Sequence, residues 1–302
     1  MDKILIICGP TASGKSALSL NLAALLPAAE IINGDVLQCY KKIPIISAQP
    51  DLSNVTIAHH LYSFLDVTEN FSVAKWLDKI VPLTKDILAK QHTPIIVGGS
   101  GMYLNSLIKG LKKTPDIPAE ISEQTNQLVT QKGLTYLYQQ LCAIDPNTTE
   151  LLNNTDPTRI IRAYNLYQTA KLTPSAYQKL DNHQFFPKDR FIICYLKPER
   201  EQLYENCNQR FAEMLENGLL DEVKYLNNYP NAAAHKAIGY KEFSAYLAGE
   251  NSYAEALELA KQNTRRYAKR QMTWFNNQLD AEFNLIKATN PDDIIKELQK
   301  LC

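Results

Sequence analysis

The sequence predicts an α/β protein in which a parallel sheet is flanked by helices and interrupted by an inserted all-helical subdomain. Short, continuous apolar runs alternate with helical segments in the first part of the chain, which is typical of parallel strands buried on both faces. Only helical patterns follow over a middle region, and then the apolar runs return. Apolar residues make up 45% of the 302 residues and charged residues 21%, so the chain can bury a full core.

The first part of the chain contains the first strands of this sheet. The predicted elements, in chain order, are a strand at 4–8, a helix at 15–26, a strand at 30–33, a helix at 71–90 and a strand at 94–97. Pro27 ends the first helix, because proline cannot continue the hydrogen-bond ladder. Gly34-Asp35 ends the second strand and Gly98-Gly99 ends the third.

The pattern of the sequence changes near residue 114, where the strand signals stop. Up to about residue 187 we expect only helices, among them 120–131, 134–143 and 158–171. A strand returns at 190–196, and long helices from 199 to about 278 and a last strand at 282–287 follow it. The predicted organisation is therefore a core made of 1–113 and 189–302, with a helical insertion at 114–188.

Composition excludes several classes of protein. The 32 basic and 32 acidic side chains balance, so net charge alone argues neither for nor against a nucleic-acid partner. The six cysteines show no C-x-x-C pair and no zinc-ligand spacing. The first apolar run is too short for a signal peptide, and no run approaches the roughly 18 apolar residues of a membrane span. We therefore expect a cytoplasmic monomer with no membrane partner.

A phosphate-binding loop follows the first strand. Residues 9–16 match the pattern G-x-x-x-x-G-K-[ST], which arises by chance in roughly 1% of chains of this length. Its members are Gly9, Pro10, Thr11, Ala12, Ser13, Gly14, Lys15 and Ser16. In such a loop the backbone N–H groups and the helix N-terminus bind phosphate oxygens, the lysine adds a positive charge, and the serine hydroxyl can ligate Mg²⁺. The core is therefore expected to be P-loop NTPase-like, with Mg²⁺ as cofactor and Ser16 as its ligand.

The loop alone does not identify the phosphorylated ligand. An NTPase usually holds its metal with an acid at the end of another buried strand, but the segment TPIIVGGSG at 93–101 ends in glycines. Its composition favours a ligand whose diphosphate is a leaving group. The alternatives are a P-loop kinase for a small molecule or nucleotide, and an RNA-binding module without catalysis. Against the second alternative, the lysine and serine of the loop are both intact.

Eight ordered segments resemble one enzyme family, the tRNA dimethylallyltransferases. They lie at 9–16, 32–50, 59–66, 94–107, 156–167, 210–223, 236–243 and 265–275, and include INGDVLQCYKKIPIISAQP, DPTRIIRAYNLY, KAIGYKEF and RRYAKRQMTWF. The resemblance covers nearly the whole chain. It implies transfer of a dimethylallyl group from dimethylallyl diphosphate to N6 of an adenine 3′ of the anticodon, with the tRNA anticodon stem-loop as partner.

The resemblance also implies roles for individual residues. Asp35, at the end of the second strand, would be the general base for the adenine amine, and it lies beside the loop if the first two strands are neighbours. Arg210 and Thr11 would contact the diphosphate. Gln38 could form a paired hydrogen bond with the N6/N7 edge of adenine. The basic run at 261–270 has five basic residues and no acid, which suits RNA phosphates.

The residues expected to contact tRNA are spread over five of these segments. They are Asp35, Val36, Leu37, Gln38, Ser100, Thr158, Arg159, Ile160, Ile161, Arg162, Lys236, Gly239, Lys241, Arg265 and Lys269. Four positions depart from the family pattern. Val36, Gln49, Ser100 and Ser122 stand where the family usually has Ser, Lys, Thr and Arg. We expect these changes to alter contacts with tRNA and to leave the transfer reaction intact.

Overall fold

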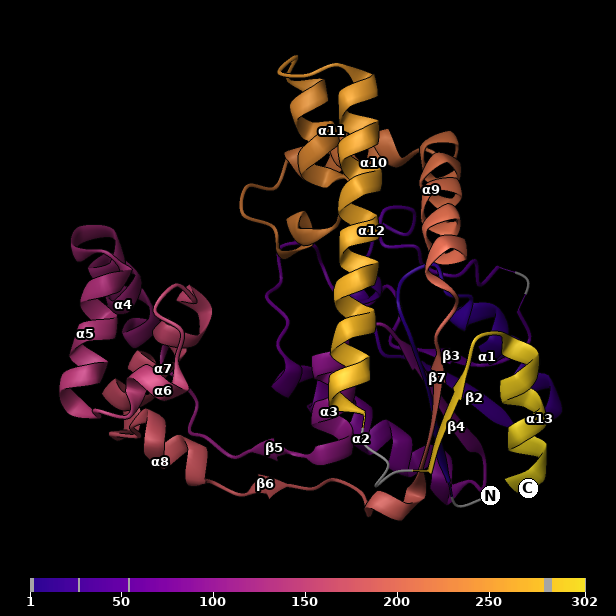
Figure 1. Cartoon of the computed structure of the whole chain (residues 1–302), viewed down its shortest axis with the longest axis horizontal. Helices are drawn as coiled ribbons and strands as arrows, with labels where there is room; N and C mark the ends of the chain where they lie inside the picture. The colour runs from indigo at the N-terminus through magenta and orange to yellow at the C-terminus, as the bar shows by residue number, and fades with distance from the viewer. Residues whose placement is uncertain (1–2, 27, 54, 280–283, 302) are drawn as a thin grey trace. The chain divides into compact units, whose positions relative to one another are not determined.

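The computed structural model describes residues 3–26, 28–53, 55–279 and 284–301 (Figure 1). The chain forms two compact units. The first unit comprises residues 1–109 and 185–302, and the second comprises residues 110–184. The sequence placed the ends of the insertion at 114 and 188, a few residues later than the ends of the second unit.

A six-stranded parallel sheet forms the centre of the first unit. The strand order is β3-β2-β4-β1-β7-β8, and every adjacent pair is parallel. The strands are β1 (Ile4–Cys8), β2 (Ala29–Asn33), β3 (His59–His60), β4 (Thr93–Gly98), β7 (Phe191–Leu196) and β8 (Asn284–Ala288). This arrangement confirms the α/β class. The predicted last strand at 282–287 corresponds to β8, although residues 282 and 283 lie outside the described part of the chain.

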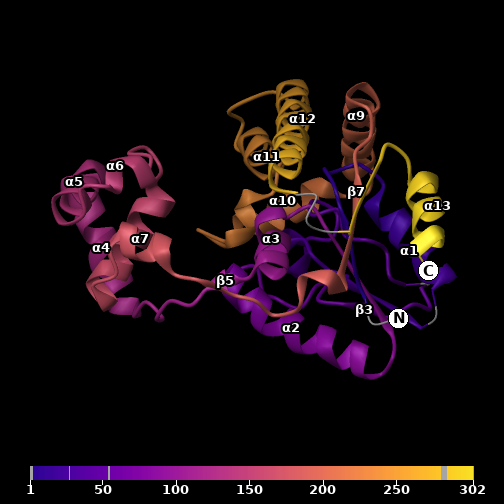
Figure 2. The same cartoon turned by 60° about the horizontal axis from the view of Figure 1, so that its bottom comes forward.

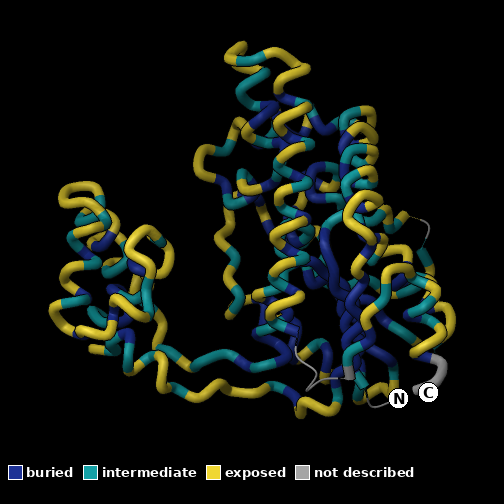
Figure 3. Tube along the Cα trace, viewed as in Figure 1, coloured by how far each residue is buried: buried dark blue, intermediate teal, exposed yellow. Residues whose placement is uncertain are grey.

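Buried aliphatic side chains explain why these runs form strands. All residues of β1, β4 and β7 are buried, and Figure 3 shows them as the dark centre of the unit. On one face of the sheet, Leu5, Ile7 and Ile95 form one cluster with Leu18 and Ile294. These last two belong to the helices α1 (Lys15–Leu25) and α13 (Pro291–Leu301). The first predicted helix is therefore confirmed, while α13 was not predicted.

Two further helices, α2 (Val73–Ala89) and α3 (Gly101–Lys109), cover the sheet on the side away from α13 (Figure 2). They pack together through the rings of Trp76 and Tyr103, whose centroids are 5.6 Å apart. The indole N–H of Trp76 donates to the backbone oxygen of Asn33 over 3.3 Å, which fixes α2 against the end of β2. The sequence predicted α2 but not α3, whose glycine start gives a weak helix signal.

A helical layer follows β7 in the first unit. It comprises α9 (Arg200–Glu216), α10 (Leu219–Asn227), the 3₁₀ helix η3 (Ala233–Lys236), α11 (Tyr240–Leu247) and α12 (Tyr253–Gln278). The longest of these helices, α12, contacts both α9 and α11 (Figure 1). A capping box fixes its start, because the Ser252 hydroxyl accepts from the Glu255 N–H and the Glu255 carboxylate accepts from the Ser252 N–H. Phe211, Val223 and Phe243 form part of the core between these helices.

The second unit has a core of its own. It contains α4 (Ala119–Lys132), α5 (Leu134–Ile144), α6 (Thr148–Leu151), α7 (Pro157–Ala170) and α8 (Pro174–Lys179). Leu137, Leu141, Ile160 and Tyr164 are buried together at its centre. The unit is not purely helical, because β5 (Leu111–Lys112) and β6 (Asn182–His183) pair antiparallel where the chain enters and leaves it. A strand of two residues is too short to give a periodic signal in the sequence.

Within the described residues, no helix is both long enough and apolar enough to cross a membrane.

Candidate active site

The phosphate loop joins β1 to α1 at the carboxyl edge of the sheet. The backbone conformation and the close packing of this loop require glycine at two positions. A Cβ atom on Gly9 would lie 2.4 Å from the backbone oxygen of Leu196, and Gly14 has the left-handed φ of +89°. The loop therefore curls as expected from its sequence, and α1 begins directly after it at Lys15.

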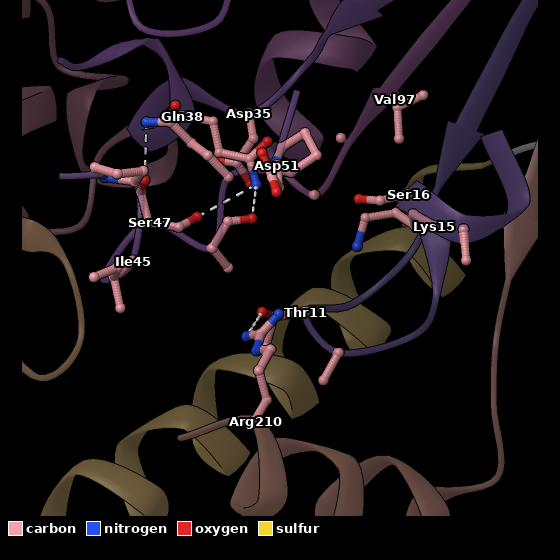
Figure 4. A pocket seen from close by; sticks show the side chains of 18 of the residues that line it. Thr11, Lys15, Ser16, Asp35, Gln38, Ile45, Ser47, Asp51, Val97 and Arg210 are labelled. Atoms are coloured by element: carbon pink, nitrogen blue, oxygen red, sulfur yellow. Dashed lines mark hydrogen bonds between the residues drawn. The ribbon is translucent and has the colours of Figure 1, made fainter. Parts of the chain in front are cut away.

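A cavity of 1030 Å³ opens beside this loop, and all of its lining residues belong to the first unit. Figure 4 shows the loop residues Thr11, Lys15 and Ser16 around it, with Asp35 and Arg210. The predicted catalytic and diphosphate-binding residues are thus brought together in one place. The sequence separates them by up to about 200 positions, so only folding assembles the site.

The side chain of Lys15 folds back and hydrogen bonds to the backbone of its own loop. Its Nζ atom donates to the Pro10 backbone oxygen over 2.6 Å. Burial lowers the pKa of Lys15 to about 8, although the nearby Asp35 carboxylate acts to raise it and Arg210 adds to the lowering. An incoming diphosphate would supply further negative charge beside this ammonium and favour its protonated form.

The helix α9 supports the loop from the other side. Arg210 donates a hydrogen bond to the Thr11 hydroxyl, and Asn206 donates to the Ala12 backbone oxygen over 3.2 Å. Arg210 and Asn206 both line the cavity. A guanidinium at this point adds a second positive charge beside the loop, which suits the compact double charge of a diphosphate.

Asp35 follows β2 and is fixed by its neighbours. The Asp35 N–H donates to Asn33 Oδ1 over 2.8 Å, and the side chain of Asp35 accepts from the Leu37 N–H over 3.1 Å. Burial raises the pKa of Asp35, while the hydrogen bond from Leu37 and the charge of Lys15 act in the opposite direction. A carboxylate with a raised pKa that faces a cavity is suited to accept a proton.

The two strands that carry the loop and Asp35 are not neighbours, so the condition stated for the position of Asp35 is not met. β4 lies between β1 and β2 and pairs with both. Asp35 still lines the cavity beside the loop, because β4 ends at Gly98 and Gly99 follows it. A Cβ atom on Gly98 would lie 2.1 Å from the Gly34 backbone oxygen, and one on Gly99 would lie 3.6 Å from Asp35 Oδ2. Without side chains at this point, β4 leaves room for Asp35 to face the loop.

Gln38 lies in the cavity but cannot form the expected paired hydrogen bond. Its amide nitrogen already donates to the backbone oxygens of Ser47, over 3.3 Å, and Ala48, over 2.8 Å. Its Oε1 atom is left to accept from an adenine amine. Of the residues beside it, Val36 donates its N–H to Ser100 Oγ over 3.2 Å, and Leu37 packs against the hydrophobic core.

A second cavity, of 1230 Å³, lies between η3, α11 and α12. We call it the basic groove. Its positively charged lining residues are Lys236, Lys241, Arg266, Lys269 and Arg270, and all five are exposed. The predicted tRNA-binding residues Lys236, Lys241 and Lys269 are therefore brought together. Arg266 and Arg270 belong with them, since residues four apart share a helix face.

Arg265 and Gly239, which were predicted with these residues, do not line the groove. Arg265 points toward α9, where its Nη1 atom donates to Asn208 Oδ1 over 2.6 Å. The neighbouring Ala268 packs on the same side against Leu203. Gly239 is buried, and its φ of +104° starts α11 while its N–H donates to Glu242 over 2.9 Å. This backbone conformation and the nearby Phe211 ring, 3.0 Å from where a Cβ atom would lie, are sufficient reasons for a glycine here.

The second unit places its predicted residues on different faces of α7. Ile160 is fully buried in the core of that unit and offers no exposed contact, and Ile161 is half-buried against the same cluster. Thr158, Arg159 and Arg162 are exposed. Arg159 pairs with Asp156 over 3.4 Å, and Arg162 donates to Thr114 Oγ1 over 3.4 Å. Consecutive residues of a helix cannot all face one partner, which explains the difference.

Sequence reasoning missed several polar residues of the cavity, among them Asn206 and Gln271. Gln271 has the most direct contact with the loop and with the turn after β4. It is buried on α12 and hydrogen bonds to Thr11 and Gly99. A signal was present in the sequence. Buried positions recur along α12 at Thr264, Ala268 and Phe275, and this spacing puts a glutamine on the buried stripe. A polar side chain on such a stripe must find polar partners in the fold.

The site suits a metal ion that is coordinated mostly by oxygens of a bound diphosphate and of water, and only in part by the protein. No three His, Cys, Asp or Glu side chains among the described residues form a group that could hold a metal ion. Ser16 is exposed and lines the cavity. Mg²⁺ usually keeps several waters and binds through one or two protein oxygens together with phosphate oxygens. The donors that are present therefore fit Mg²⁺ bound with a diphosphate, and they do not fit a metal that needs a full protein cage.

A parallel α/β core with a phosphate loop, and with a carboxylate facing that loop across one cavity, is typical of an enzyme that acts on a phosphorylated ligand. Comparison with known proteins gives the particular family. Residues 38–278 match the model of the IPP transferase family. The chain belongs to this family.

Full-length relatives and solved structures agree with this assignment. The chain is 39% identical to a tRNA dimethylallyltransferase of Rickettsia bellii, over 99% of this chain and 95% of the relative. A tRNA isopentenylpyrophosphate transferase from Bacillus halodurans superimposes with a TM-score of 0.70 at 31% identity, over 100% of this chain and 95% of that one. A eukaryotic dimethylallyltransferase acting on tRNA gives a TM-score of 0.83 at 26% identity, over 99% and 77%.

Proposed function

We propose that this protein transfers the dimethylallyl group of dimethylallyl diphosphate to N6 of the adenine 3′ of the anticodon in tRNA. The observation that carries the proposal is the position of Asp35, which faces the phosphate loop across one cavity. A kinase needs a metal-holding acid at the end of a neighbouring strand, but β4 ends in Gly98, and Gly99 follows it. The site is better suited to a diphosphate that leaves than to a phosphate that is transferred.

The reaction forms a bond between N6 and C1 of the donor and breaks the bond between C1 and the diphosphate oxygen. One proton leaves N6, and Asp35 is placed to accept it. The loop N–H groups, Lys15 and Arg210 are placed to stabilise the negative charge that develops on the diphosphate. Thr11 adds its hydroxyl, which Arg210 already orients. The protein thus stabilises the leaving group on one side of the cavity and activates the nucleophile on the other.

Mg²⁺ bound by Ser16 would neutralise part of the diphosphate charge. Gln38 would accept a hydrogen bond from the adenine amine through Oε1, because its amide nitrogen is already engaged with the backbone. That contact would favour adenine over guanine, which carries an oxygen at the corresponding position.

The basic groove would bind the tRNA backbone. Its five exposed cations suit a line of phosphates, which position an RNA without reading its sequence. In the second unit, the exposed Thr158, Arg159 and Arg162 would add contacts to the anticodon stem-loop. The target adenine must leave its stack to reach a cavity of this kind. We further propose that the enzyme acts as a monomer in the cytoplasm, where its substrate tRNA is found.

The test is a transfer assay with two labelled donors. The protein is incubated with tRNA and with either labelled dimethylallyl diphosphate or γ-labelled ATP, and control samples lack tRNA. Label from the prenyl donor should appear in tRNA, and digestion followed by mass spectrometry should locate it on adenine N6. Transfer of phosphate from ATP without prenyl transfer would instead support a kinase and refute the proposal.

A further inference from the structure

The side chain of Gln271 connects the two halves of the reaction site. Its Oε1 atom accepts from the Thr11 N–H over 2.8 Å, and its Nε2 atom donates to the Gly99 backbone oxygen over 2.8 Å. Only 6% of Gln271 is exposed, so these hydrogen bonds are shielded from water. One amide therefore spans the gap between the phosphate loop and the turn that follows β4.

Each end of this bridge leads directly to a group that we assign to the chemistry. On one side, the hydroxyl of Thr11 accepts from Arg210, which faces the diphosphate position. On the other side, the backbone of Gly99 lies against the Asp35 carboxylate, since a Cβ atom on Gly99 would lie 3.6 Å from Asp35 Oδ2. The bridge thus runs from the base to the leaving-group site through one side chain.

The fit around Gln271 is too close to be incidental. A Cβ atom on Gly99 would lie 2.5 Å from Gln271 Nε2, so the amide packs directly on the glycine backbone. One turn later, Trp274 packs on Gly101 in the same way, since a Cβ atom there would lie 2.3 Å from its ring. These two contacts seat α12 on the segment that follows β4, and they fix where the Gln271 amide lies.

We propose that Gln271 is a positioning residue, which sets the distance between Asp35 and the phosphate loop so that N6 and C1 meet in line. The proposal rests on the proposed function, because it assigns Asp35 and the loop to the two sides of that reaction. Most donors to the diphosphate, namely the remaining loop N–H groups, Lys15 and Arg210, do not depend on this amide. Its loss should therefore affect turnover more than donor binding.

Two variants test this prediction. Gln271→Met has nearly the same length but makes neither hydrogen bond, and Gln271→Asn keeps the amide but is one carbon–carbon bond too short to reach both partners. A misplacement of about 1 Å can cost about 100-fold in rate. We expect kcat to fall about 10- to 100-fold in both variants, while the dissociation constant for dimethylallyl diphosphate, measured by calorimetry without tRNA, changes less than about threefold.

Thr264→Ala is the matched control. Thr264 is buried on the same helix and donates to the Ala260 backbone oxygen over 2.9 Å, but it lines neither cavity. Its loss should lower thermal stability about as much as the Gln271 variants do and leave kcat unchanged. Asparagine keeps a polar side chain at 271, so Gln271→Asn provides the test if Gln271→Met does not fold.

The possible outcomes separate the two proposals. A loss of kcat in both Gln271 variants that greatly exceeds that in Thr264→Ala, with donor affinity retained, supports positioning. Equal kcat in all three variants refutes it, and so does a loss of donor affinity as large as the loss of kcat, which would make Gln271 a binding residue. If the wild-type protein transfers no prenyl group to tRNA, the proposed function itself fails.

Discussion

Replacing Arg266 and Arg270 with glutamine should weaken tRNA binding in a way that depends on salt. Both side chains are exposed in the basic groove, and they lie four residues apart on one face of α12. Phosphate contacts made by such side chains release counterions from the RNA. Their removal should therefore flatten the dependence of binding on ionic strength, and not merely lower the affinity.

The expected size follows from the number of contacts. Each lost phosphate contact reduces the log–log slope of affinity against salt by about 0.7–0.9, so two contacts give about 1.4–1.8. Between 50 and 200 mM salt, the wild-type protein should thus lose about 7- to 12-fold more affinity than the double variant. The KM for the prenyl donor should hardly change, because the diphosphate residues line the other cavity.

Arg265→Gln is the matched control for this experiment. It removes the same charge from the same helix, but Arg265 donates to Asn208 and lies outside the groove. Binding of a fluorescently labelled anticodon stem-loop would be followed by anisotropy across the salt series, with a thermal melt of each variant. An unchanged slope in the double variant, or an equal change in Arg265→Gln, would refute the assignment of the groove to RNA phosphates.

Three further predictions concern the reaction site and the second unit. Asp35→Asn should bind the donor normally and lose about 10²- to 10⁴-fold in turnover; turnover within about threefold of wild type would exclude a general base at this position. Donor affinity should fall as pH rises through about 8, because burial lowers the pKa of Lys15 to about 8 and only its protonated form attracts diphosphate. A dissociation constant that stays flat from about pH 7 to 9.5 would contradict this role of the charge. Replacing residues 113–181 with a short turn, which the antiparallel pair Lys112 and Asn182 can accept, should abolish transfer to tRNA and preserve donor binding; normal transfer would show that the second unit is dispensable.

The local parts of this fold were predictable because they are encoded locally. The phosphate loop is defined by glycine and lysine spacing, and the strands by unbroken apolar runs such as Ile4–Cys8. The helix expected at 15–26 is α1, Lys15–Leu25. These features depend on neighbours in the sequence, so that a pattern over a few residues is enough to identify them.

The parts that were not predictable depend on contacts between distant segments. Periodicity shows that Arg266 and Arg270 share a face of α12, but not whether that face meets protein or solvent. Packing between α12 and α9 decides this, and it turns Arg265 toward Asn208. In the same way, Ile160 and Ile161 lie between two arginines in the sequence, but only Ile160 is fully buried, because its face of α7 meets α5.

The order of the strands explains how the site has room for its reaction. Reacting atoms approach within about 3–3.5 Å before bond formation, and the amine must also lie about 3 Å from the base that accepts its proton. These two distances together exceed the spacing of neighbouring strands, which is about 4.8 Å. If β1 and β2 were neighbours, Asp35 would be too close to the loop for donor and adenine to fit between them. The insertion of β4 doubles the spacing to about 9.6 Å, and the glycines after Val97 keep side chains of this segment out of that space. The same glycines deprive β4 of a metal-holding acid, so the geometry that admits prenyl transfer also removes a group that phosphate transfer would need.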